Sequence, residues 1–162
     1  MIKNPEVLLG VTWSAGVLAT AVLAAAWAVG ASQTSESETA REAQSLKTVC
    51  ARCHNLQIVM DTPKSYDAWH DTVQKMVDLG AKGTDDQLDD VMDYLHRTMT
   101  TIDVNSADAD ELQIVLNVSE ATAQAIVARR RAKKFSGLAD LKSVPGIEAS
   151  TVDAKARMIF FR

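Results

Sequence analysis

Two cysteines and a histidine stand together in this sequence, as Cys50-Ala51-Arg52-Cys53-His54. No other cysteine occurs among the 162 residues. With two residues between them, the thiols are compatible with a redox disulfide, with half of a zinc site, or with the attachment of a haem. His54 separates these alternatives, because an imidazole directly after the second cysteine completes the C-x-x-C-H pattern of c-type haem attachment.

The chemistry of a covalent haem requires this spacing. Two thiols on one helical turn add to the two vinyl groups of the porphyrin, and the adjacent histidine becomes the proximal iron ligand. A zinc site needs a further pair of cysteines or histidines at suitable spacing, and a thioredoxin-like site needs a surrounding βαβ pattern. Neither is found. We therefore predict one covalent haem c on Cys50 and Cys53, with His54 as a metal ligand.

The second axial ligand remains open on the residues alone. Met60 lies too close to the motif in sequence to reach the opposite haem face easily, and Met92 falls on an apolar helix face where core packing is the simpler role. His96 is expected at the surface. The further candidates are His70, Met76 and Met99.

A wider pattern resembles the small single-haem cytochrome c domains of bacterial dehydrogenases. It consists of the C-x-x-C-H motif followed by Trp69, Met76, Gly80 and Tyr94-Leu95. The resemblance implies Met76 as the second iron ligand, and a thioether ligand favours ferrous iron. It also implies that Trp69 covers the haem or fills the core beneath it. Tyr94 is a core aromatic or a hydrogen-bond partner of a propionate.

Helical periodicity runs through the whole soluble part, so we predict an all-α fold. Capping boxes are expected at Thr84-Asp85-Asp86-Gln87 and at Asp108-Ala109-Asp110-Glu111. Ser65 is a candidate N-cap and Gly80 a helix stop. The predicted helices cover about residues 40–55, 66–79, 84–99, 108–115, 120–133, 138–143 and 149–160. The expected domains are a monohaem domain over residues 40–100 and a second helical domain over 101–162.

The second domain resembles the tandem helix-hairpin-helix domain of bacterial DNA-uptake competence proteins. The matching residues are 103–112, 123–126, Phe135, 138–141 and 144–147. In that family each hairpin carries Gly-hydrophobic-Gly, which lets backbone N–H groups approach a phosphate. Here the first hairpin reads Asn117-Val118-Ser119 and the second reads Gly146-Ile147-Glu148.

These differences from the family's hairpins argue against DNA binding. Three of the four hairpin glycines are missing, and Glu148 puts a carboxylate where a phosphate would lie. The basic run 129–134 would attract phosphates, but cations at a helix end also complement the helix dipole. The net charge of the chain is -4, without the basic excess typical of nucleic-acid binding. We expect this domain to dock the chain to a protein.

The N-terminus predicts a membrane anchor over residues 1–31, followed by a polar tether over residues 32–39. No charged residue occurs from Val7 to Ala31, and about 20 apolar residues span a bilayer. A cleavable signal peptide is the alternative, with Val29-Gly30-Ala31 as the cleavage site, although signal h-regions are usually shorter, about 7–15 residues.

The sequence as a whole predicts a bacterial inner-membrane cytochrome whose soluble part lies on the periplasmic side. It would pass single electrons to or within a respiratory or photosynthetic complex, as a carrier rather than an enzyme, with redox proteins as partners. The acidic excess from Glu42 to Met99 would suit a basic docking face. Two alternatives remain: a surface DNA-binding or uptake protein with the haem as sensor or staple, and a structural subunit with its haem off the electron path.

Overall fold

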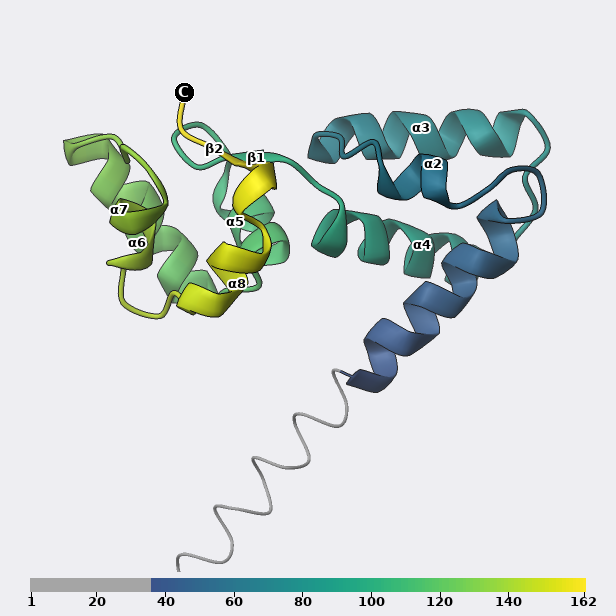
Figure 1. Ribbon diagram of the computed structural model, residues 1–162, viewed down its shortest axis with the longest axis horizontal. Coiled ribbons are helices and arrows are strands. Elements are labelled where there is room, and N and C mark those ends of the chain that lie inside the picture. Colours follow the sequence, from purple (N-terminus) through teal and green to yellow (C-terminus); the bar gives the residue numbers. More distant parts are fainter. Residues whose placement is uncertain (1–35) are drawn as a thin grey trace, which may run out of the picture. The chain divides into compact units, whose positions relative to one another are not determined.

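The computed structural model describes residues 36–162 and is mostly helical in that range, with two short strands (Figure 1). Residues 38–162 form one compact unit. Within it, the part that carries the cysteine motif, residues 40–100, is called here the cysteine-motif domain. Its helices are one over residues 36–50, α2 (Gln57–Met60), α3 (Tyr66–Asp78) and α4 (Asp85–Thr98).

The remainder, called here the C-terminal module, covers residues 101–162. It begins with strand β1 and ends with strand β2, and four α-helices and a 3₁₀ turn lie between them. The elements are β1 (Ile102–Asp103), α5 (Ala109–Leu116), α6 (Glu120–Ala132), α7 (Leu138–Lys142), α8 (Ala149–Ala154), the 3₁₀ turn Ala156–Met158 and β2 (Ile159–Phe160).

The membrane anchor predicted over residues 1–31 and the first residues of the tether lie outside the described residues. Residues 36–39, which the sequence places in the tether, are helical. Between residues 36 and 162, no helix is long and apolar enough to cross a bilayer.

Both predicted capping boxes are confirmed. The Thr84 hydroxyl accepts from the Gln87 backbone N–H at 3.2 Å, and the Gln87 side chain accepts from the Thr84 N–H at 3.1 Å. Asp108 and Glu111 form the same reciprocal pair. These bonds satisfy backbone donors that the first helical turn leaves free, so local sequence fixes where α4 and α5 begin.

Two predicted helices end earlier than expected. The helix expected over residues 40–55 ends at Cys50, because the chain turns at residues 51–53. The helix expected over residues 149–160 ends at Ala154, and Ile159–Phe160 instead pairs in parallel with Ile102–Asp103. This pairing buries Ile102 and Ile159 and joins the two ends of the C-terminal module. The all-α prediction missed it because each strand is only two residues long.

Ion pairs hold the helix over residues 36–50 against α4. Asp90 accepts from Arg41 Nε at 3.0 Å and from the Ser45 hydroxyl at 2.8 Å. Glu42 forms an ion pair with Arg97, which lies about two turns after Asp90 in the same helix. Burial raises the pKa of the Glu42 carboxyl, and the Arg97 guanidinium opposes that rise. These contacts orient the helix whose last residue is Cys50.

The described chain has two apolar cores. The core of the cysteine-motif domain contains Leu46, Val49, Trp69, Val91, Leu95 and Met99. The core of the C-terminal module is larger and includes Val104, Leu112, Ile126, Phe135, Leu141 and Val152.

The boundary between the two domains is tied by hydrogen bonds rather than left as a free linker. Lys64 forms an isolated parallel bridge with Thr100, and its carbonyl accepts from Thr101 N–H at 2.8 Å. Lys155 Nζ donates to the carbonyls of Arg97 in α4 and Val115 in α5. Both carbonyls lie in the last turn of their helix, where the helix dipole favours a cation.

Candidate functional site

The cysteine motif lies where the first described helix stops. Cys50 is the last helical residue and is half-buried, whereas Cys53 and His54 follow in the turn and are exposed. Both thiols are free. The turn therefore presents two thiols and an imidazole on a short stretch of chain, one at a helix end and two just beyond it.

These three residues line an apolar cavity together with Met76. The cavity holds about 690 Å³ of empty space, counting its open mouth. Its lining consists of Val49, Cys50, Cys53, His54, Val73, Met76, Val77, Leu79, Ala81, Leu88 and Val91. The sequence singled out four of these residues, and the structure brings all four to one cavity. Every other lining residue is aliphatic.

The imidazole of His54 is exposed and makes one long contact with the backbone. Its Nδ1 lies 3.4 Å from the carbonyl oxygen of Asn55, a long hydrogen bond if Nδ1 carries the proton. In metal-binding histidines such a bond fixes the tautomer and leaves the second nitrogen as the ligand atom. His54 Nε2 is thus the atom available to a metal at this cavity.

Met76 comes from the last turn of α3, where a Schellman motif holds the chain. Ala81 N–H donates to the Met76 carbonyl and Gly80 N–H to the Val77 carbonyl, both at 2.9 Å. Gly80 has φ +100°, a conformation that costs glycine little. This stop, predicted at Gly80, ends the helix just after the thioether and turns residues 79–81 along the cavity.

The two aromatic residues assigned to the haem do not line the cavity. Trp69 is only 2% exposed, and its Nε1 donates to the Met99 carbonyl at 2.9 Å. Tyr94 is partly buried and packs against the same core. Of the two roles considered for Trp69, its position corresponds to filling the core.

The remaining histidines lie away from the cavity lining. His70 is exposed. The expectation that His96 lies at the surface is wrong: His96 is 7% exposed and stacks on Tyr66 with ring centroids 3.7 Å apart. Burial lowers the pKa of the His96 imidazole, because the charged form loses its hydration. The burial of His96 was not predicted because this residue directly precedes Arg97 near the polar end of α4.

Two observations bear on the redox and zinc alternatives for the cysteine pair. Burial raises the pKa of the Cys50 thiol, whereas reactive redox cysteines have a lowered pKa. Within residues 36–162, no group of three or more His, Cys, Asp or Glu side chains is placed to hold a metal ion.

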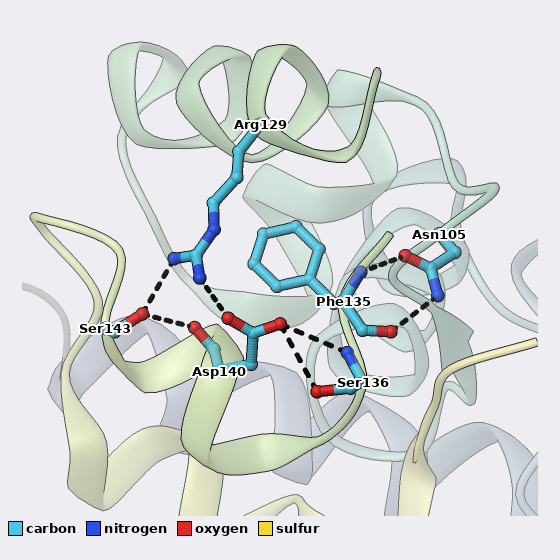
Figure 2. A network of polar contacts seen from close by, with 6 residues as sticks. All are labelled: Asn105, Arg129, Phe135, Ser136, Asp140 and Ser143. Carbon is cyan, nitrogen blue, oxygen red and sulfur yellow. Dashed lines mark hydrogen bonds and ion pairs between the residues drawn. The ribbon is translucent and has the colours of Figure 1, made fainter. Parts of the chain in front are cut away.

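In the C-terminal module, the basic run 129–134 is partly used inside the fold. Figure 2 shows the Asp140 carboxylate between Arg129, with which it forms an ion pair, and Ser136, whose backbone N–H donates at 3.1 Å. Arg129 also donates to the Ser143 hydroxyl at 2.7 Å and lies over the Phe135 ring at 4.9 Å. These contacts hold the Arg129 guanidinium against α7.

The same network ties the start of the module to the α6–α7 connection. The Asn105 amide accepts from Phe135 N–H at 2.8 Å and donates to the Phe135 carbonyl at 3.0 Å (Figure 2). Arg130 donates to the Val104 carbonyl at 2.8 Å. Two arginines of the basic run therefore stabilise the module from within, and Arg131 and Lys133 remain exposed.

The two hairpins differ in backbone conformation. In the first hairpin, Asn117 takes the left-handed conformation with φ +52°, which asparagine tolerates better than most residues. In the second, Gly146 has φ +87°, and a Cβ there would lie 2.3 Å from the Thr122 hydroxyl. Gly146 is thus packed against α6, which explains why this hairpin glycine is present.

Comparison with protein families supports the helix-hairpin-helix prediction for the C-terminal module. The sequence model of the helix-hairpin-helix motif matches residues 98–159. No curated protein and no solved structure matches the chain. The predicted helix-hairpin-helix character of the C-terminal module is confirmed, whereas the resemblance of the cysteine-motif domain to cytochrome c stays a prediction.

Sequence reasoning missed most of the cavity wall and two cations beside it. Val73 and Val77 share a face with Met76 by helical spacing, so periodicity could have found them. Arg52 lies inside the cysteine motif and Lys82 follows the α3 stop, and both line a cleft next to Cys53. Their proximity depends on how the turn at residues 79–82 packs beside the cysteine turn, which the local sequence does not specify.

Proposed function

We propose that this chain is a c-type cytochrome that transfers single electrons through one covalent haem. The observation that carries the proposal is the common cavity of Cys50, Cys53, His54 and Met76. Two thiols, one imidazole and one thioether are the groups needed to attach a haem and to provide both axial ligands. Bound there, the haem would supply the one-electron chemistry.

The protein's own contribution is attachment, ligation and exclusion of water. Cys50 and Cys53 would form the thioether bonds, His54 Nε2 would be the proximal ligand, and Met76 Sδ the distal one. The aliphatic walls formed by Val73, Leu88 and their neighbours keep the site apolar, and such burial together with a methionine ligand raises a haem potential. No acid, base or nucleophile is needed, because the fold only positions and tunes the cofactor.

We assign the C-terminal module to docking on a protein partner. Arg129 and Arg130 are engaged inside the module, and Glu148 is exposed at the second hairpin. Two cations of the basic run are therefore already bonded inside the module, and the second hairpin carries a negative charge. DNA binding is the second candidate, favoured by the helix-hairpin-helix match. The holoprotein with a labelled duplex at low salt separates the two, since DNA binding would weaken steeply as salt rises.

The location that we propose is the outer face of a bacterial inner membrane, with the uncharged segment from Val7 to Ala31 as anchor. There the chain would serve a respiratory or photosynthetic complex, as a tethered shuttle or as a fixed subunit. Fractionation of cells into membrane and soluble protein, with protease added from the outer side, checks both statements.

Covalent attachment is tested by expressing the full chain in a host with haem c maturation. The intact mass should exceed the chain mass by one haem, and the peptide containing Cys50 to His54 should carry it. Cys50→Ser with Cys53→Ser should abolish the added mass, whereas Met92→Ala, which alters the core outside the cavity lining, should retain it. An unmodified peptide from a maturation-competent host would refute the proposal.

A further inference from the structure

The loop between α3 and α4 contacts the helix that carries Cys50 at a glycine. Gly83 directly precedes Thr84, the N-cap of α4. A Cβ placed on Gly83 would lie 3.0 Å from Val49 Cγ2, whereas carbon atoms pack at about 3.5–4.0 Å. The absence of a side chain at Gly83 therefore lets the loop lie directly on Val49.

The backbone conformation of Gly83 does not require glycine. Gly83 is not one of the described glycines with positive φ. Its other neighbours leave ordinary room, since a Cβ would lie 3.5 Å from Gln87 Cβ and 3.5 Å from Leu88 Cγ. Where the backbone permits it, alanine stabilises a protein relative to glycine by restricting the unfolded chain. The close approach to Val49 is thus the feature that requires glycine here.

Val49 has little freedom to move away from the loop. Its side chain is 4% exposed and belongs to the core of the cysteine-motif domain. It lies in the helix over residues 36–50, where a β-branched side chain has one strongly preferred rotamer. Well-packed cores respond to added volume by shifts of side chains and backbone. An added methyl group on Gly83 would therefore displace either Val49 or the loop.

Both displacements would reach the proposed haem site. Val49 lines the cavity and directly precedes Cys50. On the loop side, Ala81 also lines the cavity, and its backbone N–H donates to the Met76 carbonyl at 2.9 Å. The contact between Gly83 and Val49 thus joins the helix that carries the first thiol to the loop that follows Met76.

We propose that Gly83 is a positioning residue for Met76. Because it lets the α3–α4 loop lie directly on Val49, it holds the end of α3 close to the helix of Cys50, so that the Met76 thioether can bind the iron of a haem attached there. The inference rests on the proposed function. It adds a determinant of the second axial ligand that does not itself line the cavity and acts through Val49 and the loop.

The test uses the purified ferric holoprotein and added imidazole, which competes with the thioether for the iron. The far-red absorption band of a methionine–iron bond reports the displacement. We expect Gly83→Ala to weaken this band and to bind imidazole roughly tenfold more tightly than wild type, a ratio within the range of overpacking effects. Gly137→Ala is the matched control, because its Cβ would meet no atom within 4 Å. It should change the imidazole affinity less than about twofold.

Removing the obstructing methyl group provides the second part of the test. Val49→Ala lacks Cγ2, so adding Gly83→Ala to Val49→Ala should change the imidazole affinity less than about twofold. If Gly83→Ala alone carries no haem, the double variant decides: recovery of haem and of the far-red band supports the proposal, and continued absence of haem overturns it. An unchanged imidazole affinity in Gly83→Ala, with or without a loss of stability, also overturns it. So does an effect that Val49→Ala leaves undiminished.

Failure of this proposal is distinguishable from failure of the proposed function. A wild-type protein without covalent haem would refute the cytochrome assignment, and a far-red band that persists in Met76→Ala would refute Met76 as the ligand. If wild type has the band and Met76→Ala lacks it, while Gly83→Ala behaves as wild type, the cytochrome assignment stands and only the positioning role of Gly83 fails.

Discussion

The two domains solve the problem of a small core in different ways. The C-terminal module buries thirteen apolar residues of the described chain in one cluster and closes it with the Asn105–Phe135 and Arg129–Asp140 contacts. The cysteine-motif domain buries six and surrounds an apolar cavity. The first is complete as a polypeptide, whereas the second has space for an added group to finish its core. Small domains commonly depend on such an addition.

Preventing haem attachment should affect the two domains most differently. Cys50→Ser with Cys53→Ser should leave the cysteine-motif domain poorly folded, since its cavity would lack the group that fills it. Hydrogen exchange should then become fast in α3 and α4 and remain slow in α5 and α6. Equal protection of α3 and α4 in the variant and the holoprotein would contradict the dependence on haem.

Removing core volume from the C-terminal module should destabilise that module and leave the cysteine-motif domain unchanged. Leu112 is fully buried, so Leu112→Ala should cost about 2–5 kcal/mol of unfolding free energy and leave the haem absorbance unchanged. Ile114→Ala, on the same helix but 38% exposed, is the control and should cost less. Urea denaturation followed by the two signals measures both. An equal loss from the two substitutions would argue against a packed core at Leu112.

Each domain has one glycine in the left-handed conformation, Gly80 and Gly146. Gly80→Ala meets no atom within 4 Å, so it should cost only the backbone term, about 1–2 kcal/mol. Gly146→Ala has the same backbone cost, and its Cβ would collide with Thr122. It should therefore destabilise the protein more, and Thr122→Ala should relieve part of the difference. A double-mutant cycle measures this coupling; a coupling of zero would contradict the packing of Gly146 on α6.

The contact between the domains should make the stability depend on pH. Burial lowers the pKa of Lys155 from 10.5 to about 8. The folded protein therefore releases this proton at lower pH than the unfolded chain, so stability should rise between about pH 8 and 10.5. Lys155→Met should abolish that rise, whereas Lys142→Met should not. A wild-type stability that falls steadily over this interval would contradict a buried Lys155 cation.

The local sequence predicted the starts of the helices well, but it predicted the ends of two helices poorly. The boxes at Thr84 and Asp108 fix their helices through contacts only three residues apart, and Gly80 stops α3 in the same local way. The β1–β2 pairing and the burial of His96 depend on partners distant in sequence, such as Tyr66, which stacks on His96 from another helix. Composition and periodicity carry no information about such partners.

The sequence singled out four residues that share the cavity but not its surroundings. The cysteine spacing pointed to Cys50, Cys53 and His54, and the resemblance to small cytochrome c domains implied Met76; all four line the cavity. Arg52 and Lys82, which line the adjoining cleft, come together only because two turns meet.

The most direct test of the account is a reversible redox titration of the purified holoprotein, followed by haem absorbance. Wild type is compared with Met76→Ala and with Met92→Ala as the control. We expect a positive potential that falls sharply in Met76→Ala and changes little in Met92→Ala, because Met76 lines the cavity and Met92 does not. A low potential indifferent to Met76 would contradict His54–Met76 ligation and the role of this chain as an electron carrier.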